Sequence, residues 1–266
     1  DPPRVLFDGP VNATWAANHA AYWRDLGIDG FLFHGLIDTL DSPGEAETAK
    51  GDESPLTREL RVACQRLHEA GLDHHFLYLS ISPEDRWYTD RTLAREAITR
   101  FARAGVICRR AGLRGLAIDT NSASLIHDFR WDGYDLEVTP AETIRQGARD
   151  LARRALRAYI REHPEAEILI VADRAAEAGP LFFDFFEGLL EGVGAAESLH
   201  LSLLPRESSL LSNPLAMETH LERLNRIIGL RLSRSSADLW RQQGGYSLCL
   251  HPADLTGDGR AVLSAP

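Results

Sequence analysis

The chain has 266 residues, of which 44% are hydrophobic and 26% charged, and its formal net charge is -10 at pH 7. This length and composition suit a protein with one real hydrophobic core, within the size range of a single α/β barrel. The negative charge argues against a nucleic-acid partner, whose phosphates select basic surfaces, and no stretch of sequence is long and apolar enough to predict a membrane span.

The chain alternates between strand and helix patterns from its beginning to residue 251. Short apolar runs predict strands over residues 5–8, 30–34, 75–82, 115–119, 167–173, 199–204 and 246–251. Between them, apolar residues at helical spacing predict helices over residues 14–26, 55–70, 90–111, 139–163, 181–190 and 214–243. Repeated strand–helix units of this kind are typical of parallel α/β proteins.

We therefore predict an α/β fold, a (β/α)8 TIM-type barrel that forms one domain over residues 1–266. Seven strands can be counted, and residues 254–266 resemble a loop leading to a further element. The prediction is accordingly a barrel that lacks its last strand–helix unit in this chain. The chain begins at Asp1-Pro2-Pro3 without Met, which fits a removed signal peptide and a secreted or periplasmic protein, and equally a trimmed start.

At least four of the predicted strands end on a residue that can carry or hold a proton. These residues are Asp8, His34, Asp119 and Asp173. In a parallel α/β barrel the C-terminal ends of all strands meet at one face, where the active site lies. The sequence thus predicts a ring of carboxylates and imidazoles around a single mouth, and Asp119 ends the cleanest strand.

The residues around Asp119 resemble a known motif. Residues 115–121 read Gly-Leu-Ala-Ile-Asp-Thr-Asn, which is similar to the fourth-strand motif of family 18 chitinases, Gly-x-Asp-x-Asp-x-Glu. Gly115 and Asp119 match it, whereas Ala117 replaces the first Asp and Asn121 replaces the Glu that protonates the leaving group in that family. An amide does not titrate, so Asn121 cannot act as a general acid. Over most of its length the chain is similar in pattern to uncharacterised glycoside-hydrolase-like barrels of secreted bacterial proteins.

This resemblance implies a glycoside-hydrolase-like enzyme that acts on a poly- or oligosaccharide. Glycosidases need two carboxyl groups flanking the bond, so we expect Asp119 to work with Asp173 or with Glu207. The predicted substrate contacts lie at strand ends and in the loops that follow strands: Asp8, His34, Asn121, Trp87, Trp131, Tyr134 and His251. Aromatic rings on loops suit pyranose rings, which carry both C–H and O–H surface.

Two other functions remain open from the sequence. Asn121 favours a barrel that binds carbohydrate without cleaving it. A metal-dependent hydrolase or isomerase is the second alternative, because His34, Asp119, Asp173 and His251 all end strands. However, no His-x-His follows the first strand, and no Gly-rich phosphate loop or Gly-x-Ser-x-Gly elbow is present, so we predict no metal and no cofactor.

The three cysteines, Cys64, Cys108 and Cys249, show no Cys-x-x-Cys spacing and are interpreted as buried free thiols. The oligomeric state is open, because no helix shows an obvious exposed apolar stripe.

Overall fold

The computed structural model describes residues 4–36, 54–80, 89–120, 134–172, 180–194, 200–205 and 214–250. Its strands are β1 (Val5–Asp8), β2 (Gly30–Phe33), β3 (Phe76–Ser80), β4 (Gly115–Asp119), β5 (Glu167–Ala172), β6 (His200–Pro205), β7 (Gly244–Tyr246) and β8 (Leu248–Leu250). Its helices are α1 (Ala13–Asn18), α2 (Ala20–Asp25), α4 (Pro55–Glu69), α5 (Arg91–Ala111), α6 (Ala141–Glu162), α7 (Pro180–Val193), α8 (Pro214–Arg231) and α9 (Arg234–Gln243).

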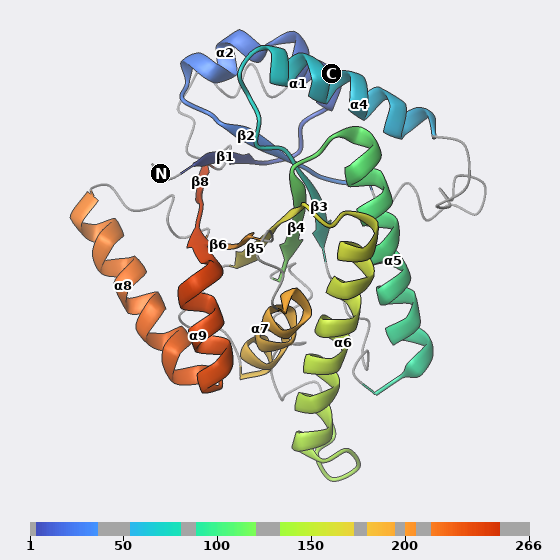
Figure 1. Cartoon of the computed structure of the whole chain (residues 1–266), viewed down its shortest axis with the longest axis vertical. Coiled ribbons are helices and arrows are strands. Elements are labelled where there is room, and N and C mark those ends of the chain that lie inside the picture. The colour runs from blue at the N-terminus through green and yellow to red at the C-terminus, as the bar shows by residue number, and fades with distance from the viewer. Residues whose placement is uncertain are drawn as a thin grey trace.

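The strands form one curled parallel sheet in the order β7-β6-β5-β4-β3-β2-β1-β8 (Figure 1). Only Ser247 separates β7, which pairs with β6, from β8, which pairs with β1. At this junction the Ser247 amide donates to the carbonyl of Leu203 and the Leu248 amide to that of Arg4, both at 3.0 Å. The stretch from Gly244 to Leu250 therefore joins the two ends of the sheet and acts as a seventh strand.

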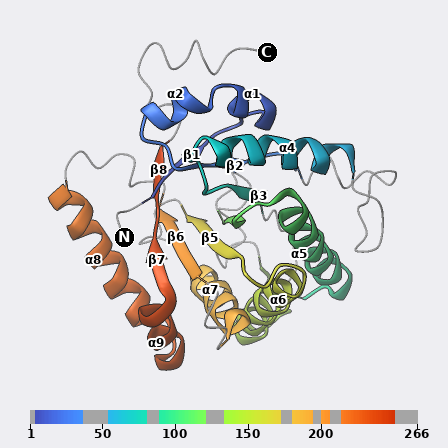
Figure 2. The same cartoon turned by 45° about the horizontal axis from the view of Figure 1, so that its top comes forward.

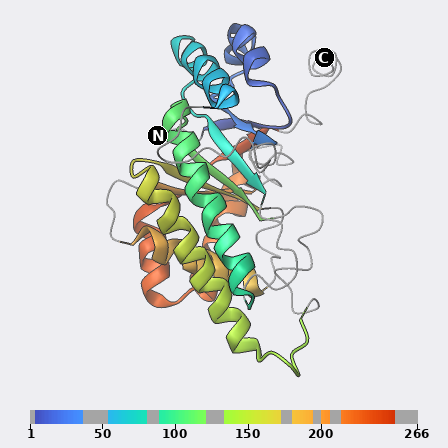
Figure 3. The same cartoon turned by 90° about the vertical axis from the view of Figure 1, so that its right-hand side faces the viewer.

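The helices lie around the outside of the sheet (Figure 2). Seen from the side, α5 and α6 run next to each other along it (Figure 3), and α6 also packs against α7. The described residues form a parallel sheet with seven strand positions, wrapped by helices, which is consistent with a TIM-type barrel that lacks a final unit. The predicted fold class is confirmed in this form.

Two apolar clusters fill the space on either side of the sheet. The larger lies between sheet and helices and includes Phe7, Trp23 and Phe31. The smaller consists of residues from the other face of the strands: Leu6, Leu32, Phe76, Ala117, Leu169, Val171 and Leu204. Since side chains alternate along a strand, this smaller cluster identifies the inward face of the barrel, on which the functional residues are expected.

Two predicted helices are each divided in the structure. The helix expected over residues 14–26 is interrupted at His19, whose ring nitrogen Nδ1 lies 2.9 Å from the carbonyl of Trp15. The helical region expected over residues 214–243 is split into α8 and α9. Ser233 begins α9 as its N-cap, because its hydroxyl accepts a hydrogen bond from the amide of Ser236.

Candidate active site

Four polar residues lie on the inward face of the sheet, at or next to the C-terminal ends of the first four strands. Asp8, His34, Tyr78 and Asp119 each stand two residues after an inward-facing apolar residue: Leu6, Leu32, Phe76 and Ala117. With a side-chain period of two, these four residues extend the inward face by one level. The barrel interior is thus apolar toward the N-terminal ends of the strands and polar near the C-terminal ends of β1 to β4. We call the four residues Asp8, His34, Tyr78 and Asp119 the polar layer.

Asp8 and His34 form the first pair in the polar layer. His34 Nε2 lies 2.9 Å from Asp8 Oδ1, and Asp8 is only 1% exposed. The carboxylate orients the imidazole and selects which ring nitrogen carries the proton, as such pairs do in many active sites. The other ring nitrogen, Nδ1, is the atom through which His34 could contact a substrate.

Tyr78 and Asp119 form the second pair. The Tyr78 hydroxyl donates a hydrogen bond to Asp119 Oδ2, and Asp119 is 2% exposed. This bond fixes the position of the Asp119 carboxylate, because a carboxylate oxygen accepts the hydroxyl proton. The Tyr78 ring also stacks on the His34 ring, with centroids 3.7 Å apart and planes at 21°, which links the two pairs.

The backbone on both sides of Asp119 is held by its neighbours in the sheet. Asp119 is in register with Ser80 on β3 and with Val171 on β5. The next residue, Thr120, is buried, and its amide and hydroxyl both donate to the carbonyl of Val171, at 3.1 and 2.9 Å. The carboxylate therefore projects from a fixed backbone, which is the arrangement a catalytic group requires.

Of the residues predicted from the sequence to form the site, the structure brings three together: Asp8, His34 and Asp119. Tyr134 precedes α6 and is half-buried against the larger apolar cluster. The remaining predictions lie outside the described residues: Trp87, Asn121, Trp131, Asp173, Glu207 and His251. The expected pairing of Asp119 with Asp173 or with Glu207 therefore stays a prediction.

Tyr78 was not predicted from the sequence as a site residue. The signal for it was nevertheless present, because Phe76, Tyr78 and Ser80 alternate along a strand that ends beside Asp119. The sequence prediction considered the last residue of each strand and the loop that follows it, whereas Tyr78 lies one inward position before the end of β3.

The described residues offer neither a cluster of metal ligands nor an activated thiol. Within the described part of the chain, no group of three or more His, Cys, Asp and Glu side chains is arranged to hold a metal ion. Cys64 and Cys108 are buried free thiols, as predicted, and burial raises the pKa of each to about 12, so neither is an activated nucleophile. The same residues include no helix long and apolar enough to cross a membrane.

No protein-family model matches the chain, and a search of curated proteins found no match in sequence. Among solved structures the chain is similar to a GH18 chitinase from Pseudoalteromonas aurantia, with a TM-score of 0.49 and 11% identity over 98% of both chains. It is also similar to endonuclease IV from Thermus thermophilus, with a TM-score of 0.45 and 15% identity over 98% of this chain and 99% of that one. Neither similarity identifies an activity, so any function has to be inferred from the polar layer.

Proposed function

We propose that this protein is a glycoside-hydrolase-like enzyme that cleaves a poly- or oligosaccharide at the C-terminal end of its barrel. The observation that carries the proposal is the buried Asp119 carboxylate, held by the Tyr78 hydroxyl beside the Asp8–His34 pair. A carboxylate held in place at a strand end can be one of the two carboxyl groups that glycosidases use. The net charge of -10 also favours a neutral sugar over a polyanionic nucleic acid.

Asp119 takes the role of nucleophile or base in this proposal. In this role Asp119 acts through its carboxylate oxygens, one of which Tyr78 holds in place, whereas the general acid has to deliver a proton to the leaving oxygen. The acid therefore comes from a second carboxyl group, Asp173 or Glu207. A separation of about 5 Å between the two carboxyl groups would give retention of configuration, and more than about 6.5 Å would give inversion.

The other residues serve binding. The Asp8–His34 pair presents an oriented imidazole that can hydrogen-bond a sugar hydroxyl, and His251 and Asn121 supply further polar contacts. Trp87, Trp131 and Tyr134 provide aromatic surfaces for pyranose rings. A polysaccharide substrate is in keeping with a secreted or periplasmic protein, which we include in the proposal.

A second function, carbohydrate binding without cleavage, is favoured by Asn121. In the chitinase motif an acid stands at this position, and here an amide does. A panel of oligosaccharides distinguishes the two functions. Release of new reducing ends by the purified protein supports the enzyme, saturable binding without release supports the binding protein, and neither binding nor release on a broad panel contradicts both.

A further inference from the structure

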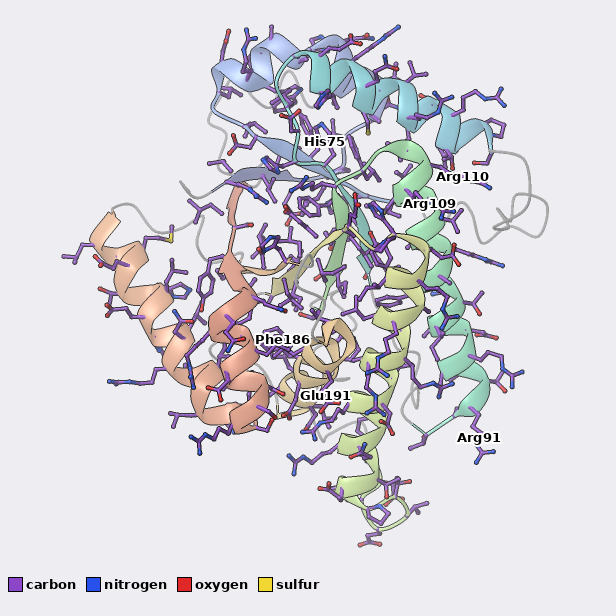
Figure 4. The ribbon with its side chains drawn as sticks, in the orientation of Figure 1. His75, Arg91, Arg109, Arg110, Phe186 and Glu191 are labelled. Atoms are coloured by element: carbon purple, nitrogen blue, oxygen red, sulfur yellow. The ribbon has the colours of Figure 1, made fainter. Side chains whose placement is uncertain are left out.

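A groove lies between the start of α5 and the neighbouring helix α6. Its volume is about 410 Å³, and five of the residues that line it are charged: Asp90, Arg91, Arg95, Asp150 and Arg154. Figure 4 labels Arg91 at the opposite end of α5 from Arg109 and Arg110, and Figure 3 shows α5 and α6 side by side. We call this pocket the α5–α6 groove.

The three arginines of the α5–α6 groove are open to a ligand. Arg91, Arg95 and Arg154 are exposed, and within the described part of the chain their guanidinium groups have no hydrogen-bond or ion-pair partner. The arginines of α6 that face α7 differ, because each of them pairs with a carboxylate: Arg145, Arg149 and Arg153. The groove therefore holds positive charge that the protein itself leaves unpaired.

The positions of these arginines do not stabilise the helices that carry them. Arg91 is the first residue of α5, where the helix dipole disfavours a positive charge. Arg95 follows at the i, i+4 spacing, at which like charges repel each other. Arg154 adds a third positive charge from α6 across the groove. An anion bound between the two helices would neutralise all three charges.

Two carboxylates in the lining each keep one oxygen unused. Asp90 Oδ1 accepts hydrogen bonds from the amides of Thr92 and Leu93, and Asp150 Oδ1 pairs with Arg153. Among the described residues, Oδ2 of Asp90 and of Asp150 has no partner. A free carboxylate oxygen accepts hydrogen bonds, and the hydroxyl groups of a sugar donate them. The lining thus matches a ligand that combines a negative charge with hydroxyl groups.

Gly147 gives the groove room for such a ligand. It lies within α6 and borders the groove, so this part of the lining has no side chain. Glycine inside a helix costs stability relative to alanine, and an open groove gives a reason for that cost.

We infer that the α5–α6 groove binds a sugar unit that carries an anionic group, either the carboxylate of a uronic acid or the phosphate of a sugar phosphate. Arg91, Arg95 and Arg154 bind the anionic group, since guanidinium groups bind carboxylate and phosphate through paired N–H donors. The free oxygens of Asp90 and Asp150 accept hydrogen bonds from the sugar hydroxyls. The groove does not depend on the proposed hydrolase activity, so either inference can fail alone.

The test is calorimetric titration of the full chain at pH 7 and constant ionic strength with glucuronate and with glucose 6-phosphate. Glucose and inorganic phosphate are the controls for the sugar and for the anion. We expect saturable binding of at least one of the two anionic sugars, and the tighter of them identifies the anionic group. Glucose should not bind, and inorganic phosphate should bind more weakly than that sugar, because it lacks the hydroxyl groups that Asp90 and Asp150 accept.

Three variants assign the binding to the α5–α6 groove. Arg91→Gln/Arg154→Gln removes one guanidinium group from each helix and should lower the affinity at least about tenfold, because charge-assisted hydrogen bonds are the stronger ones. Gly147→Met keeps every charge but places a side chain in the lining, and should also weaken binding. Arg100→Gln/Arg161→Gln is the matched control, because it removes the same charge from exposed positions of α5 and α6 outside the groove, and should leave the affinity unchanged.

Thermal unfolding of each variant shows that the substituted protein is folded. Four results would each overturn the inference: no binding of either anionic sugar by the wild type, inorganic phosphate binding as tightly as the better sugar, undiminished affinity in the folded Arg91/Arg154 or Gly147 variant, and an equal loss of affinity in the Arg100/Arg161 variant.

Discussion

Tyr78 connects the two halves of the polar layer. Its hydroxyl donates to Asp119, and its ring stacks on His34, which is itself bonded to Asp8. One side chain thus holds both the central carboxylate and the imidazole in place. In the proposed enzyme, Tyr78 is a positioning residue that acts through Asp119.

Tyr78→Phe separates these two contributions, because it removes the hydroxyl and keeps the ring against His34. We expect kcat to fall by roughly tenfold, the order of one hydrogen bond to a charged group, with a smaller change in KM. Steady-state kinetics on the best substrate of the oligosaccharide panel would measure both. Replacement by Leu, which also removes the stacked ring, should lower kcat further, and equal activity of the Phe variant and the wild type would contradict the positioning role.

Much of the polar layer was predictable from the sequence. Asp8, His34 and Asp119 follow short apolar runs, and the parallel barrel geometry brings such strand ends together whatever the details of the loops. What could not be predicted is which side chains bond to each other. The Asp8–His34 and Tyr78–Asp119 pairs depend on strand register and on side-chain rotamers, neither of which is encoded in a local pattern.

His75 should make the stability of the protein depend on pH. Its folded pKa, about 4, lies below the ordinary value of 6.5, so between these values the unfolded chain binds a proton that the folded chain does not. The contribution of His75 to stability is therefore complete above pH 6.5 and is lost as the pH falls toward 4, by about 3 kcal/mol over the window.

His75→Phe should remove this part of the pH dependence. Urea unfolding at several pH values between 4 and 7 gives, for the wild type and for the variant, a curve of the free energy of unfolding against pH. His74 and His163 have lowered pKa values for the same reason, burial, and they titrate in both proteins, so the difference isolates His75. If the curves of the wild type and of His75→Phe run parallel between pH 4 and 7, His75 does not stay neutral in the folded state.

At the level of the elements, α6 and α7 are joined by a series of ion pairs beside their apolar contact. Arg145 binds Asp184 at 3.1 Å, Arg149 binds Glu187, and Arg153 lies 3.6 Å from Glu191. Figure 4 labels Phe186 and Glu191, both on α7. The helices approach closely at Gly188, where an added Cβ would lie 2.2 Å from the carbonyl of Arg149.

Glu187 is the residue of this series with the largest expected effect on stability. It is buried, 3% exposed, and its Oε1 also accepts a hydrogen bond from the Ser233 amide at 3.1 Å, which ties α9 to α7. Glu187→Ala leaves both the Arg149 guanidinium and the Ser233 amide without this acceptor. We expect a loss of about 2 to 4 kcal/mol in the free energy of unfolding, measured in urea.

Glu142→Ala is the matched control, because it also removes one carboxylate that pairs with an arginine of α6. Glu142 lies 3.4 Å from Arg145 but is mostly exposed, so its loss should cost at most about 1 kcal/mol. If Glu187→Ala and Glu142→Ala lower the free energy of unfolding by similar amounts, burial does not determine how much these ion pairs stabilise the protein.

The sequence predicted where α6 and α7 lie along the chain better than it predicted which of their residues contact each other. Apolar spacing located α6 and the Phe-rich α7 to within a few residues. The arginines at positions 145, 149 and 153 follow the i, i+4 spacing of a single helix face, but their partners are about 40 residues away. Only the packing of α7 against α6 selects those partners.

On the scale of the whole molecule, the stretch from Gly244 to Leu250 holds the curled sheet together by pairing with β6 and with β1. Ser247→Pro removes the amide that donates to the Leu203 carbonyl, and we expect a loss of at least about 2 kcal/mol in the free energy of unfolding. Ser247→Ala keeps that amide and should cost less. Equal stability of the two variants would show that this strand adds little to the closure of the sheet.

Two features of the structure lie at opposite ends of the barrel. The polar layer lies at the C-terminal ends of the strands, and a basic pocket, lined by His75 and by arginines of α4 and α5, lies at the N-terminal end of β3. Alternation of strand and helix patterns predicted the barrel, because that pattern depends only on local spacing. The basic pocket was not predicted, because its residues come from three segments whose proximity appears only in the folded chain.

The central claim, that Asp119 is the catalytic carboxylate of a glycoside-hydrolase-like enzyme, is tested most directly by Asp119→Asn. Asn keeps the shape of the side chain and its acceptor for Tyr78 but removes the charge, so thermal unfolding should show an intact fold. We predict that the rate of reducing-end release falls by about a hundredfold or more, in keeping with the loss of one acid–base or nucleophilic group. A folded Asp119→Asn variant that retains the full activity of the wild type would contradict the account.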